Sequence, residues 1–142
     1  MAFSTTFRSS VASLIWTATA IANVADNAAS SPITNIQVGL HTGDPSSGNQ
    51  TTSETNYTSY ARVAVARTTS GYTDTAGVVT NDAQIAFPTA TGGSSTCTHV
   101  SNGTASSGTG VLIVGGALTA SLAVSSGITP TFAISALTVT VA

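Results

Sequence analysis

The side chains that could do acid–base chemistry gather around one polar loop of this sequence. His41, Asp44, Glu54 and Arg62 lie close together in a chain with few charges. Asp44 and Glu54 could form the carboxylate pair of a glycosidase, which needs two carboxyl groups several ångströms apart around the scissile bond. The sequence holds only three tyrosines that could stack on a sugar, and Asp44-Pro45 is typical of a turn. We therefore expect no catalytic residue here and no enzyme.

A metal site is the second kind of chemistry to consider. His41 and His99 could both bind a metal if their strands were adjacent, but zinc needs three or four ligands and no matching cluster follows from the spacing. Cys97 is the only cysteine, and in a strand it shares a face with His99 simply because residues i and i+2 always do. We expect a packed, structural Cys97, no metal site and no cofactor.

For Arg62 the sequence supports a more specific prediction, an ion pair within the chain. It is flanked by Ala61 and Val63 on an expected strand, and a guanidinium cannot shed its charge when it is partly covered. We predict that Arg62 forms a bidentate bridge to Asp44 or Glu54 and so pins the loop of residues 42–59 over the strand. A carboxylate of a partner and bare solvent remain the alternatives.

The composition excludes several classes of protein. Charged residues make up 6% of the 142 residues, against about 25% in an ordinary soluble domain. Three arginines cannot neutralise a run of phosphates, so nucleic-acid binding is not expected. No stretch offers about 20 uninterrupted apolar residues, so a membrane span is not expected. A surface with so little charge instead favours contact with other protein molecules.

The N-terminal part of the sequence has the spacing of an amphipathic helix. Apolar residues recur at steps of three and four, which predicts a helix over residues 5–28, with Pro32 just beyond. We treat residues 1–30 as a retained helical segment rather than a secretory signal. Trp16 lies off the main stripe and is either a partly buried core contact or an anchor for a neighbouring subunit. The apolar stripe consists of Phe7, Val11, Leu14, Ile15, Ala18, Ile21, Ala22 and Ala25.

After residue 30 the pattern changes to a period of two, which predicts a second region, 31–142, made of short antiparallel strands. Glycine pairs and Asn-Gly steps, including Asn102-Gly103 and Gly115-Gly116, indicate turns between them. About eight strands predict a mainly β fold, an antiparallel β-sandwich or jelly roll with an N-terminal α-helix. The alternation slips between Ile134 and Leu137 as a β-bulge would require. Strands are expected at about 36–40, 61–66, 76–80, 83–88, 96–101, 111–114, 117–124 and 131–141.

Four motifs occur in an order that resembles a family of small structural proteins of tailed bacteriophages. They are LHTGDP, TSYARVAVART, STCTHV and the C-terminal stretch from GGALT to LTVTVA, and together they cover about residues 36–142. Where that family has a hydrophobic segment and an acidic turn after THV, this chain has Ser101-Asn102-Gly103. The resemblance implies a virion structural protein without catalytic activity.

Composition and resemblance together predict a capsid cement or decoration protein on the outer shell of the virion. Its partners would be the major capsid protein and further copies of itself, with a homotrimer expected by analogy alone. The alternative is a tail or tail-fibre component that recognises a host surface, and a carbohydrate-binding module or enzyme ranks third. The expected contact residues are Phe7, Trp16, Ile21, Tyr57, Tyr60 and Arg62.

Overall fold

The chain forms two compact units in this computed structural model, which describes residues 4–21 and 33–141. Both units are built from interleaved segments, whereas the division predicted from the sequence, 1–30 and 31–142, follows chain order. The first unit comprises Met1–Thr34, Ala66–Ile85 and Phe132–Ala142, and the second comprises Asn35–Val65 and Ala86–Thr131.

The first unit contains the helix α1, Thr5–Trp16. Ser4 caps its N-terminus, because the Ser4 hydroxyl oxygen accepts the Phe7 N–H at 3.2 Å and so satisfies one of the free donors of the first turn. The helix ends at Trp16, followed by Ala18 in the left-handed region at φ 57°. The predicted helix over 5–28 is therefore wrong for residues 17–21, and residues 22–28 lie outside the described part of the chain.

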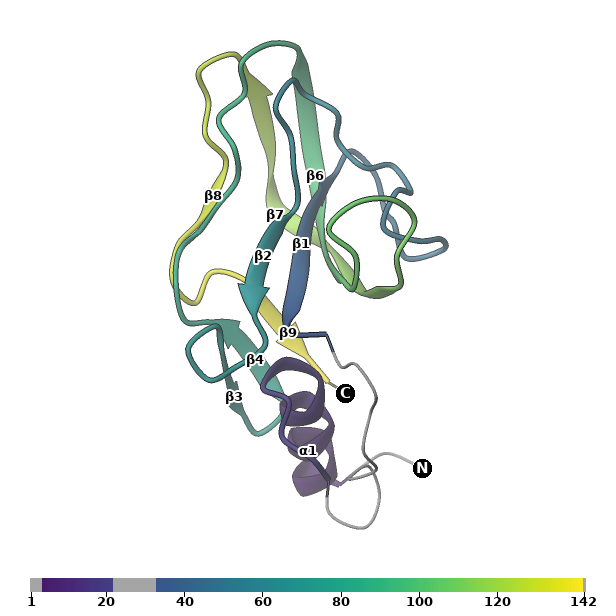
Figure 1. Cartoon of the computed structure of the whole chain (residues 1–142), viewed down its shortest axis with the longest axis vertical. Coiled ribbons are helices and arrows are strands. Elements are labelled where there is room, and N and C mark those ends of the chain that lie inside the picture. The colour runs from purple at the N-terminus through teal and green to yellow at the C-terminus, as the bar shows by residue number, and fades with distance from the viewer. Residues whose placement is uncertain (1–3, 22–32, 142) are drawn as a thin grey trace. The chain divides into compact units, whose positions relative to one another are not determined.

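A three-stranded antiparallel sheet completes the first unit, with strand order β3-β4-β9. The strands are β3 (Tyr72–Thr75), β4 (Val78–Asn81) and β9 (Thr138–Thr140). Helix α1 packs against β3 and β4 (Figure 1). This packing buries apolar side chains that hold the short helix in place, since a helix of 12 residues is marginal by itself. The buried apolar residues of the unit include Ala12, Trp16, Tyr72, Val79 and Leu137.

The second unit is built on a four-stranded sheet with the order β2-β1-β6-β7. Its strands are β1 (Asn35–His41), β2 (Val63–Ala66), β6 (Ser94–Gly103) and β7 (Leu112–Ser125). Strand β6 pairs antiparallel with both β1 and β7. Almost all of β1 is buried, so both faces of the sheet are covered at this strand.

The two faces of the β1–β6 pair differ in chemistry. Opposite residues of an antiparallel pair share a face, so the pairing shows which side chains lie together. One face carries Val38 and Leu40, and Leu40 lies opposite Val100. The other face carries His41 opposite His99. Cys97 is free and fully buried, as predicted. The polar face of β1 is where the candidate site lies.

The mainly β fold with antiparallel sheets and one N-terminal helix is confirmed. Two further short strands, β5 (Ile85–Ala86) and β8 (Thr131–Phe132), pair with each other. The described residues thus hold nine strands, against about eight expected. A jelly-roll topology stays a prediction. None of the described helices is long and apolar enough to cross a membrane.

Several predicted strand boundaries are wrong because the residue type alone does not decide whether the backbone turns. Strand β7 runs straight through Gly115-Gly116, and β6 includes Asn102-Gly103, because these glycines adopt extended backbone rather than positive φ. Conversely, the expected bulge between Ile134 and Leu137 is a turn, with Ser135 at φ 60°. Glycine permits a turn but does not impose one when both flanking segments can join a sheet.

Candidate functional site

The polar loop after β1 closes back onto the strand that it leaves. The Thr42 N–H donates to Ser53 O at 2.8 Å, and the Thr55 N–H donates to Leu40 O at 2.9 Å. Glu54 forms an isolated antiparallel bridge with His41. The loop from residue 42 to 53 is thus clamped at its base, and Glu54 is delivered to the polar face of β1.

Arg62, just before β2, meets Glu54 in a bidentate ion pair. Its Nε donates to Glu54 Oε1 at 2.6 Å and its Nη2 to Oε2 at 2.7 Å. The remaining donors reach a second loop, with Nη1 bonded to Ala105 O at 2.8 Å and Nη2 to Gly108 O at 2.9 Å. The Arg62 side chain is only 2% exposed and that of Glu54 17%. A buried guanidinium with this many partners fixes three chain segments relative to one another.

Of the two carboxylates considered for the bridge, Asp44 lies elsewhere. It is exposed and accepts the Ser46 N–H at 2.9 Å, which forms the local turn expected from Asp44-Pro45. The side-chain and backbone hydrogen bonds of Ser46 lower the pKa of Asp44. The two carboxylates therefore have separate surroundings, and Glu54 alone meets Arg62.

Tyr60 extends the network from the ion pair to the backbone of β1. Its hydroxyl donates to Glu54 Oε1 at 3.0 Å and accepts the Leu40 N–H at 3.1 Å. Burial raises the pKa of Tyr60 well above its usual value. Its ring lies edge-on to Tyr57 at 5.4 Å and stacked with Phe87 at 6.3 Å between centroids. The tyrosine thus links an apolar aromatic cluster to the charged pair.

Tyr57 anchors the other side of this cluster. Its ring is 2% exposed, and its hydroxyl donates to Pro88 O at 3.0 Å. Burial raises the pKa of Tyr57 to about 12. A buried phenol of this kind stays protonated and acts as a hydrogen-bond donor. Tyr57 is therefore suited to hold the segment before β2 against the rest of the unit.

Gln50 is a site residue that the sequence did not single out. Its Oε1 accepts the N–H groups of Thr104 and Ala105 at 3.0 and 2.9 Å, and its Nε2 donates to Ala105 O at 3.2 Å. A Cβ on Gly103 or Gly110 would come within 2.2 or 2.0 Å of this side chain. Because these glycines have no side chain, the fully buried Gln50 amide fits between them and joins the loop of residues 42–53 to the loop of residues 104–110.

His41 completes the polar face of β1. Its Nδ1 lies 2.9 Å from Thr52 O, and its Nε2 lies 2.7 Å from Ser101 Oγ. Because a carbonyl only accepts, Nδ1 must carry the proton, and Nε2 then accepts from the serine hydroxyl. Burial is the largest influence on the ring and lowers the pKa of His41. The neutral imidazole is a fully bonded structural group.

The two histidines do lie on adjacent strands, as a shared metal site would require, and face each other in register. Both ring nitrogens of His41 are already bonded, however, and His99 Nδ1 lies 2.8 Å from Thr98 Oγ1. Within residues 4–21 and 33–141, no three His, Cys, Asp or Glu side chains form a group that could hold a metal ion. The histidine pair is thus built into hydrogen bonds of the sheet.

The residues expected to contact other subunits lie mostly inside the chain. Trp16 and Tyr57 are each 2% exposed, and Arg62 is 9% exposed as a residue. Phe7, Ile21 and Tyr60 are half-buried. Trp16 in particular belongs to the core of the first unit, the first of the two roles considered for it. The buried side chains of this set stabilise the chain's own units, and a contact of the half-buried ones with another subunit stays a prediction.

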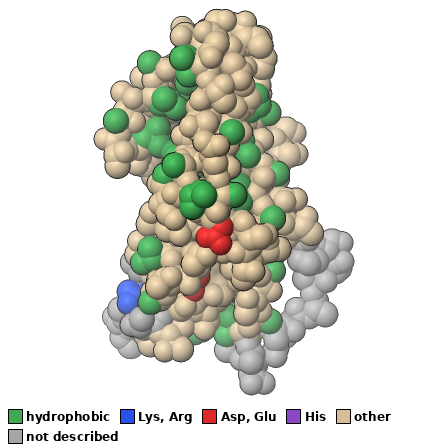
Figure 2. Space-filling model, turned by 90° about the vertical axis from the view of Figure 1, so that its left-hand side faces the viewer, with side chains coloured by type: hydrophobic (Ala, Val, Ile, Leu, Met, Phe, Trp, Pro, Cys, Tyr) green, Lys and Arg blue, Asp and Glu red, His purple; other side chains and the backbone are tan. Residues whose placement is uncertain are grey.

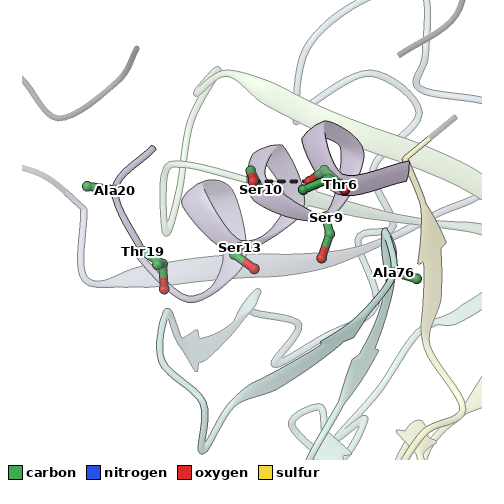
Figure 3. Close-up of a pocket in the computed structure, with 7 residues that line it drawn as sticks. All are labelled: Thr6, Ser9, Ser10, Ser13, Thr19, Ala20 and Ala76. Carbon is green, nitrogen blue, oxygen red and sulfur yellow. Dashed lines mark hydrogen bonds between the residues drawn. The ribbon is translucent and has the colours of Figure 1, made fainter. Parts of the chain in front are cut away.

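A hydroxyl-lined pocket of about 400 Å³ lies beside α1 in the first unit (Figure 3). Its three serines are already engaged, since Ser9 and Ser13 donate to Asp74 Oδ2 at 2.6 and 3.0 Å and Ser10 donates to Thr6 O at 3.1 Å. The described lining consists of Ser, Thr and Ala only. These hydrogen bonds fasten α1 to β3, which gives the serines a structural explanation.

Sequence reasoning also missed Arg67, which caps the C-terminal end of α1. Its Nη2 and Nε donate to Leu14 O and Ile15 O, two carbonyls of the last helical turn. A third bond joins Nη1 to Ile33 O at 3.2 Å. The helix has no basic residue of its own in that turn, so a distant arginine supplies the charge that complements the helix dipole. No local pattern could have revealed this contact.

Taken together, the polar site is an architectural clamp. A buried ion pair, a buried amide, a neutral histidine and two tyrosine hydroxyls tie the loops to the sheet. Figure 2 shows one face of the molecule on which hydrophobic side chains are scattered and only a few charged side chains are visible. The site's polar groups thus have an architectural role, because their hydrogen bonds hold loops and sheet together.

Comparison with known proteins agrees with this conclusion. No curated protein matches the chain. A family model, described as podophage GP4 fiber I protein gp80, matches residues 12–140, which is nearly the whole sequence. The prediction of a phage virion structural protein is thereby confirmed. The chain belongs to the family of the podophage GP4 fiber I protein gp80.

Proposed function

We propose that this chain is a structural component of a phage fibre. The observation that carries the proposal is the family match over residues 12–140, whose description is a fiber protein. The fibre role was the alternative predicted from the sequence, and it fits that description better than the capsid cement role that was ranked first. The virion is therefore the expected location, with the fibre rather than the capsid surface as the place.

The role proposed here is mechanical and not enzymatic. The clamp around Glu54 and Arg62 engages both charges in hydrogen bonds inside the chain, where neither is presented to a substrate. His41 is likewise committed on both ring nitrogens. Groups held in this way raise the rigidity of the polar face of β1. A fibre needs such rigidity in each subunit because small deformations add up along its length.

Assembly with further copies of this chain is the second part of the proposal. Apolar area buried between subunits contributes on the order of 25 cal/mol per Å² before ordering costs. Repetition of modest contacts then gives avidity without any strong single bond. Contacts between uncharged surfaces also depend little on salt. Such a fibre would stay assembled in waters of very different ionic strength.

The position of the chain in purified phage particles tests the proposal. An antibody against the full chain, followed by electron microscopy, should label fibres and leave the capsid shell unlabelled. Quantitative gels should give a few dozen copies per particle or fewer, relative to the major capsid protein. Labelling spread over the shell, together with hundreds of copies, would identify a cement protein that binds the major capsid protein and would overturn the fibre role.

A further inference from the structure

Strand β7 is an outer strand of the four-stranded sheet of the second unit (Figure 1). With 14 residues it is the longest strand of the described chain. Its inner edge pairs with β6. In the described residues, the backbone hydrogen bonds made outside the regular ladders do not involve residues 112–124. The outer edge of β7 thus presents backbone N–H and C=O groups that a further strand could pair with.

This edge lacks the charged and proline residues that usually protect an edge strand against pairing. Natural edge strands are blunted by charged side chains, by proline or by bulges. No Asp, Glu, Lys or Arg follows Asp82 in the sequence, and β7 contains no proline. Bulges do interrupt its pairing with β6 on either side of a short regular segment, Val114–Ala117. That segment keeps a regular register with β6, which leaves its outer edge able to accept a second strand.

On the apolar face of the sheet, this segment places a valine side chain next to a glycine. Val114 lies opposite Asn102, and Gly116 lies opposite Val100, so Val114 and Gly116 share one face. A Cβ built on Gly116 would have no atom within 4 Å. On the other face, a Cβ on Gly115 would come within 2.8 Å of Pro45 Cγ. Open space therefore lies above Gly116, directly beside a valine side chain.

We propose that Val114–Ala117 pairs antiparallel with the same segment of a second copy, around a two-fold axis at Gly115. In such an isologous contact the residue on the axis faces itself, and residues equally distant from it face each other. Val114 of each copy then lies opposite Gly116 of the other copy, so this contact occurs twice. Each valine side chain fills the space above the other copy's glycine, and two four-stranded sheets become one continuous sheet.

The pattern of the segment selects a second copy as the occupant. An axis at Gly116 would place the two open spaces opposite each other, and an axis at Val114 would place valine against valine. Only the axis at Gly115 sets a large side chain against a glycine at both positions. The segment also carries no charge that would face its own copy across the axis. The pairing needs nothing beyond this chain and does not rest on the fibre role.

A substitution that fills the open space tests the pairing on the full chain. Gly116→Val should be tolerated by the chain itself, because its φ is not positive and its Cβ would meet no atom within 4 Å. It should obstruct Val114 of the second copy. Ala123→Val is the matched control, since Ala123 is exposed on the same strand beyond the bulge. Circular dichroism checks that both variants fold.

Sedimentation over a range of concentrations gives the readout. The unmodified chain should dimerise. Gly116→Val should raise the dimer dissociation constant at least about tenfold, because a clash of this kind costs more than 1.4 kcal/mol. Ala123→Val should leave the dissociation constant unchanged. A folded monomer at every concentration would overturn the proposal. So would a trimer, or any oligomer that responds equally to both variants.

Cysteine cross-linking tests the register independently. Opposite residues of an antiparallel pair have Cβ atoms about 5 Å apart, which is close enough for a disulfide after small adjustments. A mixture of Val114→Cys chains with Gly116→Cys chains should form a disulfide-linked dimer on mild oxidation. Neither variant alone should do so, and the native Cys97 is buried. Cross-linking of Val114→Cys with itself would show a different register and refute the axis at Gly115.

Discussion

Arg62 and Arg67 lie close together in the sequence but stabilise the two units in different ways. Arg62 pairs with a carboxylate and two loop carbonyls in the second unit. Arg67 makes its described side-chain bonds to backbone carbonyls in the first unit, two of them at the end of α1. One arginine therefore neutralises a full opposite charge, whereas the other meets the partial charge of a helix terminus.

The comparison separates two uses of the same side chain. Removing Arg62 would leave the Glu54 carboxylate, only 17% exposed, without its counter-ion. Removing Arg67 would leave neutral carbonyls that water can solvate at the end of a short helix. Loss of Arg62 leaves a buried charge unpaired, whereas loss of Arg67 weakens the end of a helix. Loss of Arg62 should therefore cost more stability, although each arginine makes several hydrogen bonds.

Arg62→Ala should have the largest effect. Removing one partner of a buried ion pair costs about 3–5 kcal/mol of the free energy of unfolding, and denaturant titration of the full chain measures it. Arg62→Lys should lose less, because it keeps the charge but not the planar fork. A loss below about 1 kcal/mol for Arg62→Ala, as at an exposed ion pair, would mean that Glu54 is solvated and that the clamp does not hold the loops.

Gln50→Leu should come next. The substitution leaves the N–H groups of Thr104 and Ala105 without their acceptor, which costs about 2 kcal/mol by the usual penalty for unsatisfied buried groups. Gln84→Leu is the matched control because Gln84 is exposed. Hydrogen exchange should speed up at residues 104–110 in the first variant only. Equal stability of both variants would show that the second loop does not depend on this amide.

Arg67→Ala should have a smaller effect, confined to the first unit. Loss of the cation at the helix end should cost about 1–2 kcal/mol and should raise hydrogen exchange in α1 while the polar face of β1 stays protected. Arg67→Lys should recover part of the loss because it restores the charge. If exchange rose equally around Glu54 and in α1, the distinction between the two arginines would fail.

The smallest effect should be a pH dependence from His41. The pKa of His41 is lowered from 6.5 by burial, so below that value the unfolded chain binds a proton that the folded chain resists. Stability is thus fully present above pH 6.5 and declines as pH falls from there toward the lowered pKa. Thermal melts on either side of this window measure it. His41→Asn should remove the decline, and its persistence would assign the effect to another group.

Local patterns predicted the core of this fold well where they alternated cleanly. The strand over residues 36–40 corresponds to β1 (Asn35–His41), and the strand over 61–66 contains β2 (Val63–Ala66). Strand β3 was missed because its sequence, YTDT, offers little apolar alternation, and its place is set by pairing with β4. The end of α1 was missed because the apolar spacing continues past Trp16, while the backbone turns away at Ala18.

The candidate site was predictable only in part, for a related reason. Glu54 and Arg62 lie only eight residues apart, between strands β1 and β2, so short-range reasoning could bring them together. Gln50 and Arg67 bond to carbonyls or amides far away in the sequence. Backbone groups are present at every residue and leave no trace in a sequence pattern. A contact that uses them appears only when the fold is known.

The engagement of the arginines has a consequence for proteolysis. Trypsin cleaves after lysine or arginine, and this chain has only Arg8, Arg62 and Arg67 to offer. A protease must draw the residue at the scissile bond into its own specificity pocket, which a side chain 2% exposed cannot enter without local opening. Cleavage after Arg62 should thus follow the opening of the clamp, so the rate of cleavage at this residue reports how often the clamp opens.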